Sequence, residues 1–479
     1  MCFCVSSFPL LREAHLSGRS EGKGHGTLEK IREPTALCTP TSRTGYPSRM
    51  GALMLWIYRI LMMVLVPIAI PVLALRDRLV GKQRPPWSER FARRLPDIEA
   101  GGLWIHAVSV GEVEVARRLI AELDRETPAG VTVVTSTTAT GLALARKRLG
   151  DRATILASPV DLSGPVGRVF EAVKPKALVL VETELWPEML YQAGRRGIPV
   201  VVVNARLSET SFRRYSRIKS ALRPLLRPLS LILTRDQTDA ERFKDLGIED
   251  HRVTVGGNVK YDLEADMRPL EWGEEIATCA AGRPVIIAGS TLEGEEQIIL
   301  DAVESLTGSD GRRPLVILAP RHPERFEAVA HLVTERGLNF VRHSRLSDGV
   351  RAGIDVFLLD TIGELARSFQ YGAVAFIGGS LVPSGGHNPL EPAVWGVPVL
   401  SGPWVSNFEE VYREMVAAGG VRLVADSREL GAELDKWLSA PETARQAGEA
   451  GRRAVEKNRG ATARIAAEIV CRLNRTAPE

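Results

Sequence analysis

Two loops of this chain carry carboxylates in positions from which they could transfer protons. Glu112 ends the motif Ser-Val-Gly-Glu, which lies between an apolar run and a segment with helical spacing. A carboxylate within hydrogen-bond reach of a hydroxyl can take its proton, so Glu112 is a candidate general base. The alternative is a glutamate in the first turn of a helix that only stabilises the helix dipole.

The second loop, residues 181–187, holds Glu182 and Glu184 two positions apart. On an extended segment, side chains at this spacing point the same way. Two neighbouring carboxylates repel each other unless a cation or sugar hydroxyls offset the repulsion, which suits a polar binding site. Helix capping next to a buried Trp186 is the alternative interpretation.

Three cationic side chains lie close to apolar runs and are candidates for binding anions. Arg206 and Arg321 each come shortly after such a run, and Lys260 lies in the polar segment 256–262. The planar guanidinium of Arg321 could bind a phosphate through two parallel hydrogen bonds. Lys260 could pair with a carboxylate or a phosphate, although by itself it also fits a lysine on the surface.

The stretch 376–400 combines a glycine-rich loop with a helix start. Asn388 suits the N-cap and Pro389 the first helical position. Free backbone N–H groups at such a helix end can bind an anion, and Glu391 in the first turn could face the adjacent hydroxyls of a ribose. An ordinary glycine turn before a capped helix is the alternative. Further candidates here are Gly379, Ser380 and His387.

Three more loops of the second half follow apolar runs and lead into helical segments: 289–291, 320–325 and 360–364. We expect Ser290 and Thr291 to open a helix. Together with the glycine-rich loop, these segments would bring N–H donors, an arginine and a ribose acceptor to one sheet edge, as a nucleotide site requires. The chain has no GxxxxGK[ST] motif, which argues against a P-loop NTPase, and no clear Asp-x-Asp at a strand end, which argues against a metal–diphosphate site.

The elements that must position these loops alternate between strands and helices from residue 102 onward. Continuous apolar strands separated by helical segments predict parallel sheets with both faces covered. The predicted strands are 103–108, 131–134, 153–157, 177–181, 200–203, 231–233 and 253–255, followed by 284–288, 315–319, 355–359, 373–377 and 397–400.

The restart of this pattern predicts an α/β protein of two Rossmann-like domains, with a cleft between them. At 479 residues the chain is also too long for one typical core. We place the first domain at residues 79–265 and the second at 266–479. The second would include the helical run 441–473, which could pack across the domain junction.

The N-terminal part of the chain divides in two. Residues 1–49 show no helical or strand period, which indicates disorder or an artefactual extension with translation starting at Met50. Residues 50–78 are a predicted membrane anchor, since 51–75 are apolar apart from Arg59 and would form a helix of about 37 Å. Arg59 must then snorkel or face a partner, and a helix lying in the interface is the alternative to a spanning one.

The anchor is followed by a basic flank, whose members are Arg76, Arg78, Lys82, Arg84, Arg90, Arg93 and Arg94. By the positive-inside rule this flank stays in the cytoplasm together with everything after it. It could also attract anionic lipid headgroups, or be a solvated linker.

Composition limits the remaining classes of function. The net charge of +4 gives no case for nucleic-acid binding. Five scattered cysteines indicate a reducing compartment without a disulfide framework, and the eight histidines form no cluster typical of a zinc site.

Taken together, the loops resemble those of the 3-deoxy-D-manno-octulosonic acid (Kdo) transferases of lipopolysaccharide assembly. The resemblance covers about residues 51–470 in the same order, and residues 1–49 fall outside it. The segments that carry it are His-Ala-Val-Ser-Val-Gly-Glu (106–112), Glu-Thr-Glu-Leu-Trp-Pro (182–187), Asn-Ala-Arg-Leu-Ser (204–208), Val-Lys-Tyr-Asp (259–262), Pro-Arg-His-Pro-Glu-Arg-Phe (320–326) and Gly-Gly-His-Asn-Pro-Leu-Glu-Pro (385–392).

The resemblance implies a GT-B glycosyltransferase at the bacterial inner membrane, with a single N-terminal anchor and its catalytic domains in the cytoplasm. It would move Kdo from CMP-Kdo to the 6′-hydroxyl of a lipid A precursor (lipid IVA), with inversion and without a metal or other cofactor. Glu112 would be the general base, and Glu182 and Lys260 would stabilise the transition state. The residues implied to contact CMP are Pro320, Arg321, Ile362, Gly363, Glu364, Asn388, Pro389, Leu390 and Glu391.

Three other functions stay open at this level. A sugar-nucleotide epimerase or hydrolase could use the same fold, although a soluble substrate needs no anchor. A transferase of another activated sugar would keep the same machinery. A non-catalytic binding protein on this scaffold would have no use for Glu112, Lys260 and Arg321 together.

Overall fold

The computed structural model describes residues 49–80, 84–126, 130–263, 266, 268–304, 306, 312–349 and 352–476. The predicted disordered or artefactual extension therefore lies outside the described residues, except for Arg49 at the start of the first helix. The chain forms two compact units. Unit 1 comprises residues 1–257 and 462–479, and unit 2 comprises residues 258–461.

The described part of unit 1 contains a parallel sheet with the strand order β3-β2-β1-β4-β5-β6-β7. The strands are β1 (Leu103–His106), β2 (Val131–Ser136), β3 (Thr154–Ala157), β4 (Ala177–Val181), β5 (Val200–Ala205), β6 (Leu229–Thr234) and β7 (Val253–Val255). All of them overlap the predicted strands. Every residue of β1, β4 and β5 is buried, as expected for strands that helices cover on both faces.

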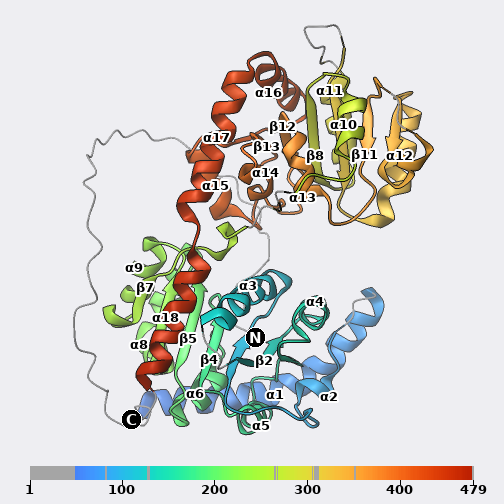
Figure 1. Cartoon of the computed structure of the whole chain (residues 1–479). Helices are drawn as coiled ribbons and strands as arrows, with labels where there is room; N and C mark the ends of the chain where they lie inside the picture. Colours follow the sequence, from blue (N-terminus) through green and yellow to red (C-terminus); the bar gives the residue numbers. More distant parts are fainter. Residues whose placement is uncertain are drawn as a thin grey trace, which may run out of the picture. The chain divides into compact units, whose positions relative to one another are not determined.

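Helices pack on this sheet, and those after β1 connect its strands (Figure 1). They are α2 (Trp87–Arg90), α3 (Val110–Glu126), α4 (Ala139–Leu149), α5 (Ser163–Val173), α6 (Pro187–Arg195), α7 (Glu209–Arg217), α8 (Lys219–Leu226) and α9 (Gln237–Asp245), with a 3-10 turn η1 at Asp250–Arg252.

The last helix, α18 (Ala461–Thr476), returns to unit 1, although we predicted that the terminal helices belong to the second domain. Arg464 Nε donates to the carbonyl of Gly256 over 3.3 Å, and an added Cβ at Gly256 would lie 3.0 Å from Ile465 Cγ1. Ile465 and Ile469 are fully buried. The boundary also falls at residue 257, earlier than the predicted 265, because the segment around Lys260 folds with unit 2.

The first helix, α1 (Arg49–Val80), contacts α6 and α8 of the same unit. Its segment Ala52–Leu79 is long and apolar enough to cross a membrane, and an 18-residue stretch within it has a mean hydropathy of 2.3 and is only 11% buried. Large apolar side chains therefore remain exposed along it, namely Leu53, Trp56, Ile57, Ile60, Leu61, Met63, Val64, Ile68, Val72 and Leu75.

Two polar residues of α1, Tyr58 and Arg59, bind buried carboxylates of unit 1. Arg59 makes two hydrogen bonds of 2.7 and 2.8 Å to the fully buried Glu188. Glu188 is therefore the partner that we expected for a charged residue within an apolar helix. Tyr58 donates to Asp161 over 2.7 Å. Asp161 also accepts the backbone N–H groups of Glu188 and Met189, so these contacts join α1 to the N-terminus of α6.

The described part of unit 2 contains a second parallel sheet, in the order β10-β11-β9-β8-β12-β13-β14. Its strands are β8 (Val285–Thr291), β9 (Leu315–Pro320), β10 (Phe340–Arg342), β11 (Val356–Leu358), β12 (Val374–Ile377), β13 (Val399–Ser401) and β14 (Val421–Leu423). We predicted all of these strands except β10 and β14. Both are three-residue edge strands that contain an arginine and lack an apolar run.

Helices cover both faces of this sheet. Successive strand residues point to opposite faces, so neighbouring residues pack against different helices. Ile286 packs in the core that contains α11, whereas Ile287 packs in the core that contains α10 and α15. The helices are α10 (Gly273–Ala280), α11 (Glu295–Glu304), α12 (Phe326–Glu335), α13 (Leu365–Ser368), α14 (Leu390–Val394), α15 (Glu409–Ala417), α16 (Ser427–Ser439) and α17 (Pro441–Asn458), with 3-10 turns η2 (Val259–Tyr261), η3 (Pro323–Arg325), η4 (His343–Asp348) and η5 (Phe369–Tyr371).

Candidate active site

The predicted carboxylates of unit 1 lie at the switch point of its sheet. β1 and β4 are neighbours, but the chain leaves them toward opposite edges of the sheet. Ligands of open α/β sheets bind in the crevice at such a point, beyond the carboxyl ends of the strands. Glu112 follows β1, and Glu182 and Glu184 follow β4. The charges of both Glu182 and Glu184 raise the pKa of Glu112, so the three carboxylates form one electrostatic group.

Glu112 is buried and held by local hydrogen bonds. Its Oε2 accepts the backbone N–H of Val108 over 2.7 Å, and its Oε1 accepts the hydroxyl of Ser109 over 2.9 Å. Burial is the largest effect on this carboxyl and, with the neighbouring carboxylates, raises its pKa to about 8. The two hydrogen bonds lower the pKa, but to a smaller extent. A carboxylate with a pKa near the working pH is suited to taking a proton.

A cation that we did not predict offsets the charge of Glu182. The Glu182 carboxylate forms an ion pair with Arg235, a buried residue that directly follows β6. Arg235 also donates from Nε to the carbonyl of Asn204 over 3.2 Å. Its position after a buried strand is the signal that would have found it, since the other candidates share this position.

The backbone around this pair adopts left-handed conformations that are unusual for residues with a side chain. The φ angles are +61° at Glu182 and +53° at Asn204. Such strain concentrates at functional sites. Arg206, a further candidate, is bound to the same loop through its backbone, since Arg206 N–H donates to the hydroxyl of Thr183 over 3.1 Å.

In unit 2, the glycine-rich loop lies at the corresponding switch point, between the neighbouring strands β8 and β12. Glu295, the first residue of α11, is fully buried and binds this loop. Its Oε2 accepts from Gly379 N–H at 2.6 Å and Leu292 N–H at 2.9 Å, and its Oε1 accepts from Ser380 N–H and Leu381 N–H, both at 2.9 Å. Glu295 was not among the predicted site residues, because nothing local in the sequence distinguishes it from Glu293 and Glu296.

Two of the predicted hydroxyls are used within the fold. Ser290 and Thr291 lie inside β8, so the expectation that they open a helix is wrong: α11 begins only at Glu295. Thr291 donates to Glu296 over 2.8 Å. Ser380 donates to the carbonyl of Ile377 over 2.6 Å and accepts from Gly402 N–H over 2.8 Å. These side chains therefore shape the loop.

Positive charge gathers beside the loop. Arg321 follows β9 and is exposed, and among the described residues no ion pair is recorded for it. Burial and the nearby Arg321 and His322 lower the pKa of His387 to about 4, so its imidazole is neutral at physiological pH. His387 Nε2 is buried and has no hydrogen-bond partner in the part of the chain that the structure describes. An added Cβ at Gly379 would lie 2.9 Å from His387 Cδ2, so the loop requires glycine there.

The start of the following helix lies one residue later than we predicted. α14 begins at Leu390 with Pro389 as its N-cap residue, instead of Asn388. Asn388 Oδ1 nevertheless accepts the N–H of Leu390 over 3.1 Å, and its Nδ2 donates to Glu391 Oε1 over 3.3 Å. The side chain thus performs the capping function from a neighbouring position.

The segment after β11 combines an exposed tip with a bound carboxylate. Ile362 is 69% exposed, and Gly363 has a φ of +105°, which favours glycine. Glu364 accepts from Trp272 Nε1 over 3.0 Å and from the hydroxyl of Thr361. Pro320, at the buried end of β9, lies on the strand next to β8.

Lys260 belongs to unit 2, although we predicted it in the first domain. Its Nζ donates to the carbonyl of Asn407 over 3.3 Å and lies 4.5 Å from the ring centroid of Phe408. Asn407 Nδ2 in turn donates to the carbonyls of Ser384 at 3.1 Å and Gly386 at 3.3 Å. Lys260 is therefore connected through one residue to the glycine-rich loop.

Comparison with known proteins identifies several relatives of this chain. A family model described as 3-deoxy-D-manno-octulosonic-acid transferase (kdotransferase) matches residues 85–263. A 3-deoxy-D-manno-octulosonic acid transferase of Haemophilus influenzae is 36% identical over 366 residues, which cover 76% of this chain and 85% of that protein. The enzyme of the same name from Bordetella pertussis is 34% identical over 401 residues, which cover 81% and 92%.

Two solved structures are similar to parts of this chain, and the first supports the fold. A putative UDP-N-acetylglucosamine 2-epimerase from Listeria monocytogenes has a TM-score of 0.50 at 14% identity and covers 79% of this chain and 98% of its own. The C-terminal CMP-Kdo binding domain of WaaA from Acinetobacter baumannii is 33% identical, with a TM-score of 0.35, and covers 36% of this chain and 90% of its own. Two parallel α/β units of this kind make up the predicted GT-B-like architecture.

Proposed function

Since this chain belongs to the family of 3-deoxy-D-manno-octulosonic acid transferases, glycosyltransferases of lipopolysaccharide biosynthesis, we propose that it moves Kdo from CMP-Kdo to the 6′-hydroxyl of a lipid A precursor with inversion. The observation that carries this proposal is the buried Glu112, with a pKa near 8, at the switch point of an α/β sheet. A sugar hydroxyl is a poor nucleophile and needs such a base.

In the proposed reaction, Glu112 takes the proton of the acceptor hydroxyl while the oxygen of that hydroxyl attacks the anomeric carbon of Kdo. The bond from that carbon to the CMP phosphate oxygen breaks, and CMP leaves with the electron pair. Glu182 and Lys260 are proposed to stabilise the transition state, and the ion pair with Arg235 offsets the negative charge of Glu182.

We assign donor binding to unit 2. A C-terminal CMP-Kdo binding domain from Acinetobacter baumannii is 33% identical to this chain over 36% of this chain's length, and unit 2 holds the C-terminal of the two sheets. Arg321 offers an exposed guanidinium close to the glycine-rich loop, whose shape Glu295 fixes by accepting the N–H groups of Gly379 and Ser380. Charge on the leaving CMP can be neutralised by Arg321, Lys260 and helix N-termini, so we propose a reaction without a metal or other cofactor.

We expect Arg321→Ala to raise KM for CMP-Kdo about 10- to 100-fold with a smaller change in kcat, because one charge-assisted contact to a phosphate is lost. Steady-state kinetics at saturating acceptor would measure this. Arg428→Ala is the matched control, since Arg428 is an exposed arginine of the same unit at the start of α16. An unchanged donor KM in Arg321→Ala would contradict a phosphate-binding role.

The raised pKa of Glu112 predicts that kcat increases with pH up to about 8, because only the ionised carboxylate can take a proton. Glu184→Gln removes a charge that raises this pKa. We therefore expect the acid side of the profile to move to lower pH, which increases activity about two- to fivefold near pH 7. Glu126→Gln, an exposed change at the end of α3, should leave the profile in place.

We propose that α1 anchors the enzyme at the cytoplasmic leaflet of the bacterial inner membrane and lies in the interface. Arg59 and Tyr58 bind α1 to unit 1, while its other apolar side chains stay exposed. A helix that presents one apolar face and is held by a domain along the other suits this position. An acceptor embedded in the bilayer would then be within reach of a membrane-bound enzyme.

The experiment that tests the function assays the purified chain with tetra-acylated lipid A precursor and a panel of CMP- and UDP-sugars. Transfer from CMP-Kdo alone, with one glycosidic product of inverted configuration, is expected. Transfer from another donor would replace the proposed substrate. Conversion of a sugar nucleotide without any acceptor would instead indicate an epimerase or hydrolase.

A further inference from the structure

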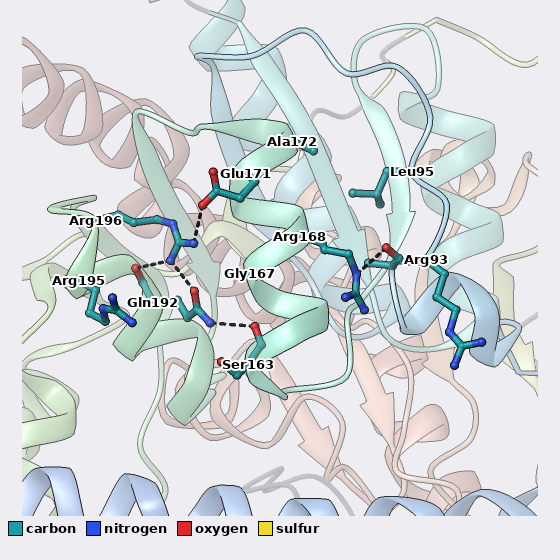
Figure 2. A pocket seen from close by; sticks show the side chains of 11 residues that line it. Arg93, Leu95, Ser163, Gly167, Arg168, Glu171, Ala172, Gln192, Arg195 and Arg196 are labelled. Carbon is teal, nitrogen blue, oxygen red and sulfur yellow. Dashed lines mark hydrogen bonds and ion pairs between the residues drawn. The ribbon is translucent and has the colours of Figure 1, made fainter.

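A hollow of about 880 Å³ in unit 1 is lined by the segment after α2, by α5 and by the end of α6. Four arginines and one glutamate contribute to its lining: Arg93, Arg168, Arg195, Arg196 and Glu171. Figure 2 shows Arg93 and Arg195 at opposite sides of the hollow, with Arg168 between them. The charged side chains of the lining therefore sum to +3, from four positive charges and one negative charge.

The four arginines differ in what they already bind. Arg168 donates to the backbone carbonyls of Phe91 at 2.7 Å and Ala92 at 3.0 Å, which fixes the segment after α2. Arg196 pairs with Glu171 over 2.7 Å. For Arg93 and Arg195, within the described residues, the recorded contacts are with the faces of aromatic rings, at 5.9 Å from Phe91 and 5.8 Å from Tyr191. These two guanidiniums can accept an anion without losing an ion pair recorded there.

The hollow is connected to α1 through Tyr191 and Glu188, which contact both a residue of its lining and Arg59. The ring of Tyr191 lies 5.8 Å from the guanidinium of Arg195 and, in addition, 4.8 Å from that of Arg59 on α1. Gln192, which lines the hollow, donates to Glu188 over 2.8 Å, and Glu188 is the ion-pair partner of Arg59. The blue ribbon of α1 runs along the lower edge of Figure 2. The arginines are thus next to the helix whose apolar side chains are exposed.

We propose that this arginine hollow binds the phosphate of an anionic membrane lipid headgroup. The inference rests on the proposed position of α1 in the membrane interface, because that position puts the adjacent hollow at the level of the headgroups. Guanidinium groups bind phosphate oxygens through paired hydrogen bonds, and basic residues near an anionic surface strengthen membrane binding. The apolar face of α1 would supply adhesion that does not depend on charge, and the hollow would supply the preference for anionic lipid.

The test uses the full chain and its double variant Arg93→Ala/Arg195→Ala, which keeps the structural contacts of Arg168 and Arg196. Flotation with neutral phosphatidylcholine vesicles is compared with flotation on vesicles that contain about one-third phosphatidylglycerol, at low and high salt. We expect native protein to prefer the anionic vesicles and the double variant to lose about 5- to 30-fold of that preference. High salt should remove the same part of the binding.

Arg125→Ala/Arg152→Ala is the control, since both arginines are exposed on the same unit and pair with Glu122 and Asp124. The proposal would be overturned if the control lost as much of the preference for anionic vesicles as the test variant. It would also be overturned if the test variant kept that preference unchanged. A raised KM for the lipid acceptor with unchanged vesicle preference would also overturn it and assign the hollow to the acceptor's phosphates. Binding of every variant to neutral vesicles tests α1 separately, and turnover of CMP-Kdo tests the proposed reaction separately.

Discussion

Glu112→Gln is expected to lower kcat about 10²- to 10⁴-fold while leaving the affinity for CMP unchanged, because the amide cannot take a proton. The replacement preserves the local contacts: the amide oxygen can accept from Val108 N–H, and the amide nitrogen can donate to the Ser109 hydroxyl. Single-turnover transfer and CMP titration would measure the two quantities. Comparable turnover in the variant would remove Glu112 from the role of base.

The same variant has a second expected effect that separates catalysis from structure. The folded state raises the pKa of Glu112 from 4.5 to about 8, so it favours the protonated form. The resulting stability is fully present below about pH 4.5 and is lost as pH rises through 8, at about 1.4 kcal/mol per pKa unit. Glu112→Gln should therefore be as stable as the native protein at low pH and more stable near pH 8.

Thermal unfolding at several pH values would check this. Glu126→Gln, on the exposed end of the same helix, should show neither the loss of turnover nor the pH-dependent gain in stability. A variant that lost activity and also unfolded at lower temperature at every pH would indicate a structural glutamate. Gain of stability with loss of function is instead typical of an active-site group held in an unfavourable environment.

Glu295→Gln is expected to destabilise the glycine-rich loop and to weaken donor binding. Each carboxylate oxygen accepts two backbone N–H groups. Whichever oxygen becomes an NH₂ group, two N–H donors lose their acceptor and face another donor. At about 1 to 3 kcal/mol for each unsatisfied group, unfolding should become about 2 to 6 kcal/mol easier, and KM for CMP-Kdo should rise.

Chemical denaturation and donor kinetics would measure both effects, with Glu293→Gln as the control, because Glu293 is exposed and precedes the helix. If Glu295→Gln kept the native stability and the native donor KM, the carboxylate would not be what holds the loop. If stability fell but donor KM stayed native, the loop would have no part in donor binding.

Much of the fold could be predicted because the central strands are buried on both faces and are therefore continuous apolar runs. Strands such as Ala177–Val181 stand out in any reading of the sequence, and the polar residues that follow them must lie at one edge of a parallel sheet. The positions of Glu112, Glu182 and Arg321 after strands follow from this rule alone. The six motifs around these loops, in the same order, carry the resemblance to the family.

Tertiary structure decided the features that depend on residues far apart in the chain. Glu295 accepts a hydrogen bond from Gly379, which lies 84 residues later in the chain. Arg235 pairs with Glu182, which lies 53 residues earlier. Helix α18 packs on unit 1 through Arg464 and Ile465. The position after a strand could have pointed to Arg235, but no local pattern distinguishes the buried Glu295 from the exposed Glu293 two residues earlier. What separates them is the free energy of burying a charge, which only the surrounding fold can offset.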